Sequence, residues 1–175
     1  MQLGLIHIYC GDGKGKTTAA LGLALRALGR GCIVLLVQFL KSQDTGELKI
    51  LEKIPGIKVL RSEENFGFTF YMTEEHRKRC NIEQNNLLEK AIEVCKKERI
   101  DLLILDEIIA AYNYNLVNRT EIIEFLREKP RNLEVVLTGR EPAIELLEMA
   151  DYISEIKKIK HPFDRGIKAR NGIEK

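Results

Sequence analysis

Short apolar runs alternate with amphipathic segments along the whole of this 175-residue chain. Two of these runs, 32–37 and 102–105, are aliphatic without alternation, which is typical of parallel strands buried on both faces. We expect strands at about 3–10, 32–37, 57–60, 102–105, 133–138 and 152–156. Between them, helical patterns end at about residue 28, cover about 47–54, 119–128 and 142–149, and include a long helix that Thr73 caps.

Alternation of this kind predicts an α/β fold, with a mostly parallel sheet and helices on both of its faces. The length suits one domain over residues 1–175. In such folds, ligands bind at the carboxyl ends of the strands. We therefore expect the functional residues directly after the apolar runs.

The first apolar run stops at the glycine-rich segment 10–18, Cys-Gly-Asp-Gly-Lys-Gly-Lys-Thr-Thr, and a helical pattern follows. Strand, glycine-rich loop and helix are the setting of a phosphate-binding P-loop, so we expect a P-loop NTPase-like (RecA-like) domain. Backbone N–H groups and the helix N-terminus would cradle the phosphates of ATP. The expected contacts come from Gly11, Asp12, Gly13, Lys14, Gly15, Lys16, Thr17 and Thr18.

Two side chains of the loop have separate roles in this hypothesis. Lys16 supplies a full positive charge to the phosphates, and the Thr17 hydroxyl is placed to ligate Mg²⁺. The loop departs from the usual pattern at its first position, where Cys10 replaces glycine. Cys10 is small, and the three glycines that follow it compensate.

Asp106 and Glu107 follow the aliphatic run 102–105 directly. Two acids at the end of a buried strand are a Walker B arrangement, which would place a carboxylate near Mg²⁺ opposite Thr17. Apolar strands that end in an acid are common, so the P-loop carries much of this interpretation. The sequence leaves open which of the two acids binds the metal directly.

Arg140 follows the expected strand 133–138 within the segment Thr-Gly-Arg. Its guanidinium could fork onto phosphate oxygens, while the alternative is a surface arginine in a turn. The basic C-terminal segment 157–173 reads as a solvated tail, a nucleic-acid patch or part of an anion site. The segment 65–72 concentrates the scarce aromatic residues, and it docks either on the core or on a large flat ligand.

Composition adds few constraints. A formal net charge of +2 indicates no particular partner, and no apolar stretch is long enough for a transmembrane helix. The four cysteines show no metal-ligand spacing, and we expect reduced thiols in a cytoplasmic protein. The first strand begins almost at once, so we expect no signal peptide.

Taken together, these motifs resemble the P-loop type of corrinoid adenosyltransferase, the ATP:cob(I)alamin adenosyltransferase family. The resemblance covers nearly the whole chain. It is carried by segments 11–20, 37–41, 46–47, 67–70, 105–107, 138–140, 150–151 and 160–174. The aromatic segment and the C-terminal signature, in this order, are far more specific than the P-loop alone.

The resemblance implies transfer of the 5′-deoxyadenosyl group of ATP to the cobalt of a reduced corrinoid, with release of triphosphate. The P-loop would then hold a leaving group, and Lys16, Thr17, Arg140 and Mg²⁺ would offset the charge that develops on it. By motif match, Thr17, Asp106 and Glu107 are the expected metal residues.

The resemblance also assigns the aromatic segment. Phe68 and Phe70 would contact the corrinoid and displace its lower axial ligand, although the position of Phe70 is usually Trp in the family. His161 is read as a structural or phosphate-side residue. The family further implies a homodimer and allows a flavoprotein-type electron donor, with no nucleic acid or membrane partner. Related proteins often carry an N-terminal segment that covers the corrin, and we expect this cover to be absent here or supplied differently.

Two other classes of function stay open at this point. A P-loop small-molecule kinase or ATPase would share the phosphate site but would make ADP. A nucleotide-dependent nucleic-acid-binding module is suggested by the basic C-terminus, and salt-sensitive binding of DNA or RNA would support it.

Overall fold

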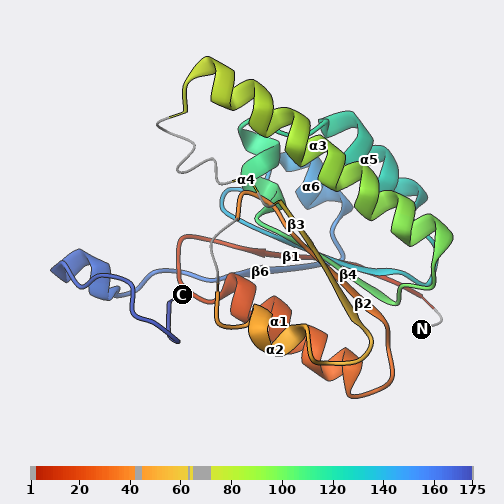
Figure 1. The fold of residues 1–175 in the computed structure, drawn as a ribbon, viewed down its shortest axis with the longest axis horizontal. Helices are drawn as coiled ribbons and strands as arrows, with labels where there is room; N and C mark the ends of the chain where they lie inside the picture. The colour runs from red at the N-terminus through yellow and green to blue at the C-terminus, as the bar shows by residue number, and fades with distance from the viewer. Residues whose placement is uncertain (1–2, 42–44, 63, 65–71, 175) are drawn as a thin grey trace.

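The computed structural model describes residues 3–41, 45–62, 64 and 72–174. Strands and helices alternate along these residues, as the apolar pattern predicts (Figure 1). The elements are β1 (Ile6–Cys10), α1 (Lys16–Leu28), β2 (Val34–Gln38), α2 (Leu48–Leu51), β3 (Ile57–Arg61), α3 (Glu74–Lys97), β4 (Leu102–Asp106), α4 (Ile108–Asn113), α5 (Arg119–Glu128), β5 (Glu134–Thr138), α6 (Ile144–Met149), β6 (Tyr152–Glu155) and a 3₁₀ helix, η2 (Pro162–Arg165).

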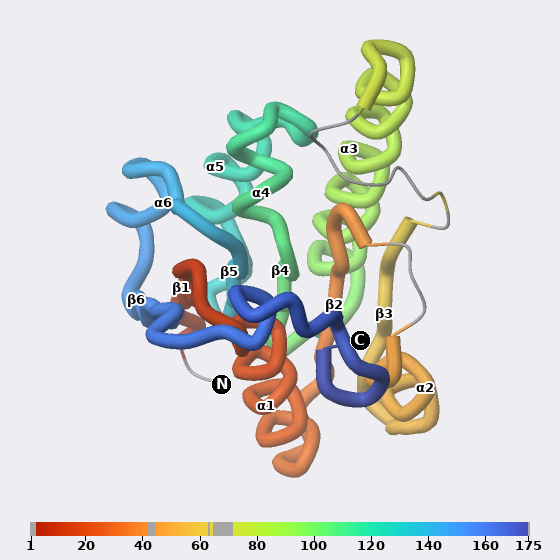
Figure 2. Tube along the Cα trace, turned by 90° about the vertical axis from the view of Figure 1, so that its left-hand side faces the viewer, coloured from red at the N-terminus to blue at the C-terminus, as the bar shows by residue number. Residues whose placement is uncertain are grey.

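The strands form one sheet of six strands in the order β3-β2-β4-β5-β1-β6 (Figure 2). Every neighbouring pair among them is parallel. This confirms the predicted α/β class with a parallel sheet. All carboxyl ends therefore lie along one edge of the sheet, where the loop after β1 and the two acids Asp106 and Glu107 also lie.

Helices cover both faces of the sheet. Figure 1 shows α1 and α2 on one face and α3, α4, α5 and α6 on the other. The central strands β2 and β4 are buried at every position because they are covered on both sides, whereas the edge strand β6 is exposed throughout. Alternate residues of a strand point to opposite faces. Leu35 of β2 accordingly joins the core on the α3 side, and Leu36 joins the core on the α1 side.

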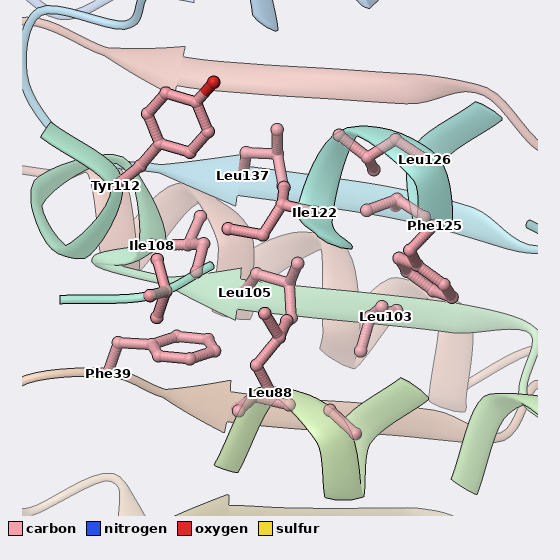
Figure 3. Packing of buried hydrophobic residues seen from close by; sticks show 14 of the residues in the cluster. Phe39, Leu88, Leu103, Leu105, Ile108, Tyr112, Ile122, Phe125, Leu126 and Leu137 are labelled. Atoms are coloured by element: carbon pink, nitrogen blue, oxygen red, sulfur yellow. The ribbon is translucent and has the colours of Figure 1, made fainter. Parts of the chain in front are cut away.

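The larger core lies between the sheet and the layer of α3, α4 and α5 (Figure 3). Phe39, Leu88, Leu105 and Ile108 meet there, and each is at most 1% exposed. Tyr112 is buried as well, and its hydroxyl donates a hydrogen bond to Glu145 Oε1 at 2.7 Å. This packing fixes helix α4, and with it the chain that leaves the end of β4.

Most of the predicted elements are confirmed, with small shifts at their ends. Helix α5 has the predicted bounds, and Thr73 caps α3 by accepting a hydrogen bond from the His76 amide at 3.2 Å. Helix α4 was not predicted, and the sequence analysis assigned no element to its residues, which follow the end of β4 after a single residue. The break between the two elements is Glu107, which adopts left-handed backbone angles with φ 61°.

The four cysteines are free thiols, and Cys10, Cys80 and Cys95 are buried. Burial raises the pKa of the Cys95 thiol to about 12 and that of Cys80 to about 11. These two are therefore packing residues rather than reactive groups. Within the ranges that the structure describes, no helix has the length and apolar character needed to cross a membrane.

Candidate functional site

The glycine-rich loop runs from the end of β1 to the start of α1 and packs against the chain that leaves β6. Gly11 has φ 103°, and a Cβ there would lie 2.4 Å from the carbonyl oxygen of Ile156. A Cβ on Gly13 would lie 2.7 Å from the same oxygen, which accepts a hydrogen bond from the Gly13 amide at 2.8 Å. The close approach of this neighbouring segment requires both glycines.

Lys16 is the first residue of α1, and its side chain folds back over the loop. The ammonium donates hydrogen bonds to the carbonyl oxygens of Gly11 at 2.8 Å and Gly13 at 2.9 Å. The residue is only 9% exposed, and this burial lowers the pKa of Lys16, while the nearby Glu107 carboxylate opposes the shift. A buried cation held on backbone carbonyls is a ready partner for an anion.

Thr17 and Asp106 meet, as the sequence predicts. Asp106 ends β4, and its carboxylate is fully buried. Asp106 Oδ1 accepts hydrogen bonds from Thr17 Oγ1 at 2.8 Å and from Thr138 Oγ1 at 2.7 Å. Asp106 Oδ2 accepts one from Lys41 Nζ at 2.6 Å, and this ammonium also lies 3.1 Å from Thr17 Oγ1. A hydroxyl and a carboxylate thus already share one cation.

Glu107 lies beside this network and has a different environment. Its amide donates a hydrogen bond to Thr138 Oγ1 at 2.9 Å, which fixes the turn between β4 and α4. Its carboxylate lies near Lys16 and acts on the pKa of that lysine. The described residues contain no cluster of three or more His, Cys, Asp or Glu side chains suited to a metal. A metal held by Thr17 and Asp106 would need its remaining ligands from water and phosphate, which is how Mg²⁺ commonly binds.

Arg140 opens onto a hollow of ≈ 540 Å³ beside the loop. Gly11, Asp12, Lys157 and Lys158 also line it. Asp12 Oδ1 accepts a hydrogen bond from the Lys158 amide at 2.9 Å, and this bond lowers the pKa of Asp12. Arg140 adds positive charge that lowers the pKa of Lys16, so the cations of this region act on one another. The hollow is lined by charges of both signs, because Glu141 and Glu155 line it as well.

Three residues at this edge of the sheet had no assigned role in the sequence analysis: Lys41, Thr138 and Gln38. Gln38 ends β2 level with Asp106, and neither polar atom of its buried amide has a hydrogen-bond partner among the described residues. All three follow or end apolar runs, as Asp106 does, and that shared position was the available signal.

Phe68 and Phe70, the predicted corrinoid residues, lie outside the described residues. His161 accepts a hydrogen bond on Nδ1 from the Phe163 amide at 3.2 Å and so caps the 3₁₀ helix η2. Of its two suggested roles, this contact supports the structural one. The C-terminal segment leads away from β6 and exposes Ile159 and Phe163 strongly.

Comparison with known proteins shows which family the chain belongs to. The family model described as ATP:corrinoid adenosyltransferase BtuR/CobO/CobP matches residues 2–174. The chain belongs to the ATP:corrinoid adenosyltransferase family. A corrinoid adenosyltransferase of Sinorhizobium is 39% identical over 99% of this chain and 81% of its own length. Those of Escherichia coli and Salmonella typhimurium are 34% and 33% identical, each over 99% of this chain and 86% of the relative.

A solved structure supports the fold alone. A KaiC-like protein from the archaeon Pyrococcus horikoshii superposes with a TM-score of 0.54 over 90% of this chain and 75% of its own, at 18% identity.

The family membership predicted from the motifs is confirmed. This adenosyltransferase is an enzyme with ATP and a corrinoid as its substrates, which decides against a kinase, an ATPase or a nucleic-acid-binding module.

Proposed function

We propose that the loop after β1 holds the triphosphate of ATP as a leaving group while the ribose faces the corrinoid. The observation that carries this is the cluster of donors at one sheet edge, where the buried Lys16 ammonium lies on the loop carbonyls. The proposed triphosphate contacts come from the loop, Gly11, Asp12, Gly13, Lys14, Gly15, Lys16, Thr17 and Thr18, and from Arg140. Residues 1–175 would work as a single domain, since one continuous sheet carries all of these groups.

In the proposed reaction, the electron pair of Co(I) forms the bond to the ribose C5′, and the bond from C5′ to the triphosphate oxygen breaks. The electrons of that bond leave on the triphosphate. No proton has to move, so no general base is required. Lys16 and Arg140 would contribute by stabilising the negative charge that develops on the departing oxygen. The remaining task of the protein is to orient C5′ toward cobalt.

We also propose a Mg²⁺ site at Thr17 and Asp106, with Glu107 beside it. The donor set fits this ion, because a hydroxyl and a carboxylate are hard oxygen ligands and they already share the Lys41 ammonium. Mg²⁺ bound there would supply Lewis-acid charge to the triphosphate. Thr138 would hold Asp106 in place, since its hydroxyl donates to the same carboxylate.

Phe68 and Phe70 remain proposed corrinoid contacts on the basis of the family motif. The family also supports proposing a homodimer and a flavoprotein-type electron donor. Strand β6 fits a role in assembly, because it is an edge strand with exposed Tyr152 and Ile153 side chains. Light scattering on the purified protein would measure the oligomeric state directly.

The direct test is an anaerobic reaction of the protein with MgATP and chemically reduced corrinoid. We expect a light-sensitive cobalt–carbon product and one triphosphate for each ATP consumed. Lys16→Ala should abolish the reaction, whereas Lys97→Ala should not, because Lys97 pairs with Glu93 on the exposed surface of α3. Release of ADP in place of triphosphate, or near-normal turnover of Lys16→Ala, would overturn the proposed role of the loop.

A further inference from the structure

Lys41 occupies the position that a metal ion would need. It lies three residues beyond the end of β2, and its side chain is 28% exposed. Its ammonium bridges Asp106 Oδ2 at 2.6 Å and Thr17 Oγ1 at 3.1 Å. These are the two side chains that the proposed function assigns to Mg²⁺, and the inference below rests on that assignment.

The ammonium is required when no metal is bound. Asp106 is completely buried, and a buried carboxylate is costly unless a cation pairs with it. The hydroxyls of Thr17 and Thr138 donate to Asp106 but carry no net charge. Within the described residues, Lys41 is the cation whose ion pair with Asp106 meets this need.

The ammonium and a dication cannot share this place. Both would contact Thr17 and Asp106, so their centres would lie within about 4 Å of each other, where like charges repel strongly. The entry of Mg²⁺ must therefore expel Lys41 from Asp106. Because the side chain is partly exposed and long, it can swing away without unfolding the core.

We propose that Lys41 is a built-in counter-ion, which neutralises Asp106 in the nucleotide-free enzyme and moves onto the triphosphate when Mg²⁺ and ATP enter. A metal ion arriving alone would have to displace the ammonium into water. A metal ion arriving with triphosphate would give the ammonium a new anionic partner. Lys41 thereby links metal binding to nucleotide binding, and makes the site selective for the metal–nucleotide complex.

The test is a titration of the nucleotide-free protein with Mn²⁺, followed by electron paramagnetic resonance of the free ion. Lys41→Met should bind Mn²⁺ roughly tenfold more tightly than the unaltered protein, since no ammonium competes for Asp106. Lys41→Arg keeps a cation and should stay close to the unaltered protein. Lys58→Met is the matched control, because Lys58 pairs with Glu98 on the exposed surface.

The second measurement adds ATP without corrinoid. ATP should strengthen Mn²⁺ binding in the unaltered protein by a larger factor than in Lys41→Met, because only the former has an ammonium to transfer. Circular dichroism checks that each variant folds, and Lys41→Gln replaces Lys41→Met if the latter does not.

Equal or weaker Mn²⁺ binding by the folded neutral variant without nucleotide would overturn the role of Lys41. Equal enhancement by ATP in both proteins would overturn it too. These titrations contain no corrinoid and no turnover. The inference can therefore fail while triphosphate release still supports the proposed function, and a failure of adenosylation is seen separately.

Discussion

Thr138, the last residue of β5, contacts both Asp106 and Glu107 at the end of β4, and Thr138→Val tests how much these contacts stabilise the protein. The hydroxyl donates a hydrogen bond to the buried Asp106 carboxylate at 2.7 Å and accepts one from the Glu107 amide at 2.9 Å. Valine keeps the shape of the side chain but can make neither bond. The substitution therefore isolates the hydroxyl from the packing around it.

The magnitude follows from these two bonds. A hydrogen bond to a charged group contributes about 1.5–3 kcal/mol, and an amide left without a partner costs about 1–3 kcal/mol. We expect Thr138→Val to lower the free energy of unfolding by about 3 kcal/mol. For a chain of this length, that corresponds to a fall of roughly 6–12 °C in the unfolding midpoint. Urea unfolding followed by circular dichroism measures the free energy directly.

Thr45→Val is the matched control. The Thr45 hydroxyl is buried and has no hydrogen-bond partner among the described residues. Removing it should be neutral or slightly stabilising, because no hydrogen bond to a described residue is lost. The reasoning is refuted if Thr138→Val costs less than about 0.5 kcal/mol, or if Thr45→Val costs as much.

Three further predictions concern glycine, pH and the corrinoid. Gly139→Ala should lower the unfolding midpoint in a thermal melt, because φ is 151° and a Cβ would lie 2.6 Å from a side-chain atom of α4. As the control, Gly22→Ala should raise the free energy of unfolding by about 0.5–1 kcal/mol, because a Cβ at this position of α1 would meet open space. Burial and the bond to Glu145 raise the pKa of Tyr112 to about 12 from 10.0, so the stability that this phenol contributes is present below pH 10 and is lost as pH rises toward 12. Urea titrations should thus show the advantage over Tyr112→Phe shrinking across that range, and a constant difference would contradict it. Phe68→Ala should slow adenosylation when Co(II) has to be reduced on the enzyme and spare it with pre-reduced Co(I), and equal losses in the two assays would exclude a role in ligand displacement.

Local patterns predicted the elements of this fold well. The aliphatic runs at 32–37 and 102–105 became β2 and β4 because strands covered on both faces have no polar side. The pattern failed at α4, where an apolar helix follows an apolar strand after a single residue. Only the left-handed backbone of Glu107 separates them, and a non-glycine residue gives no local signal for that conformation.

The candidate site was predictable as far as its motifs reach. Thr17 and Asp106 belong to patterns whose spacing has a mechanical reason, and the structure brings the Thr17 hydroxyl within 2.8 Å of the Asp106 carboxylate. Lys41 and Gln38 lie in segment 37–41, which helps to carry the family resemblance but gave neither residue a role. Their place depends on β2 being the neighbour of β4, and strand order is a tertiary property that periodicity does not encode.

Strand order also explains why the proposed cation site needs Thr138. β1, which leads into the loop, is not a neighbour of β4, since β5 lies between them. Adjacent strands are about 4.8 Å apart, so a gap of roughly 10 Å separates the ends of β1 and β4. Thr17 spans this gap from the first turn of α1 and donates a hydrogen bond to Asp106. Thr138, at the end of the intervening strand β5, donates a second one. An apolar residue at position 138 would leave the glycine-rich loop 10–18 and the acids 106–107 unchanged in the sequence. It would nevertheless free the Asp106 carboxylate to turn away from Thr17. The polar end of the intervening strand is therefore as much a part of the site as the two motifs that it joins.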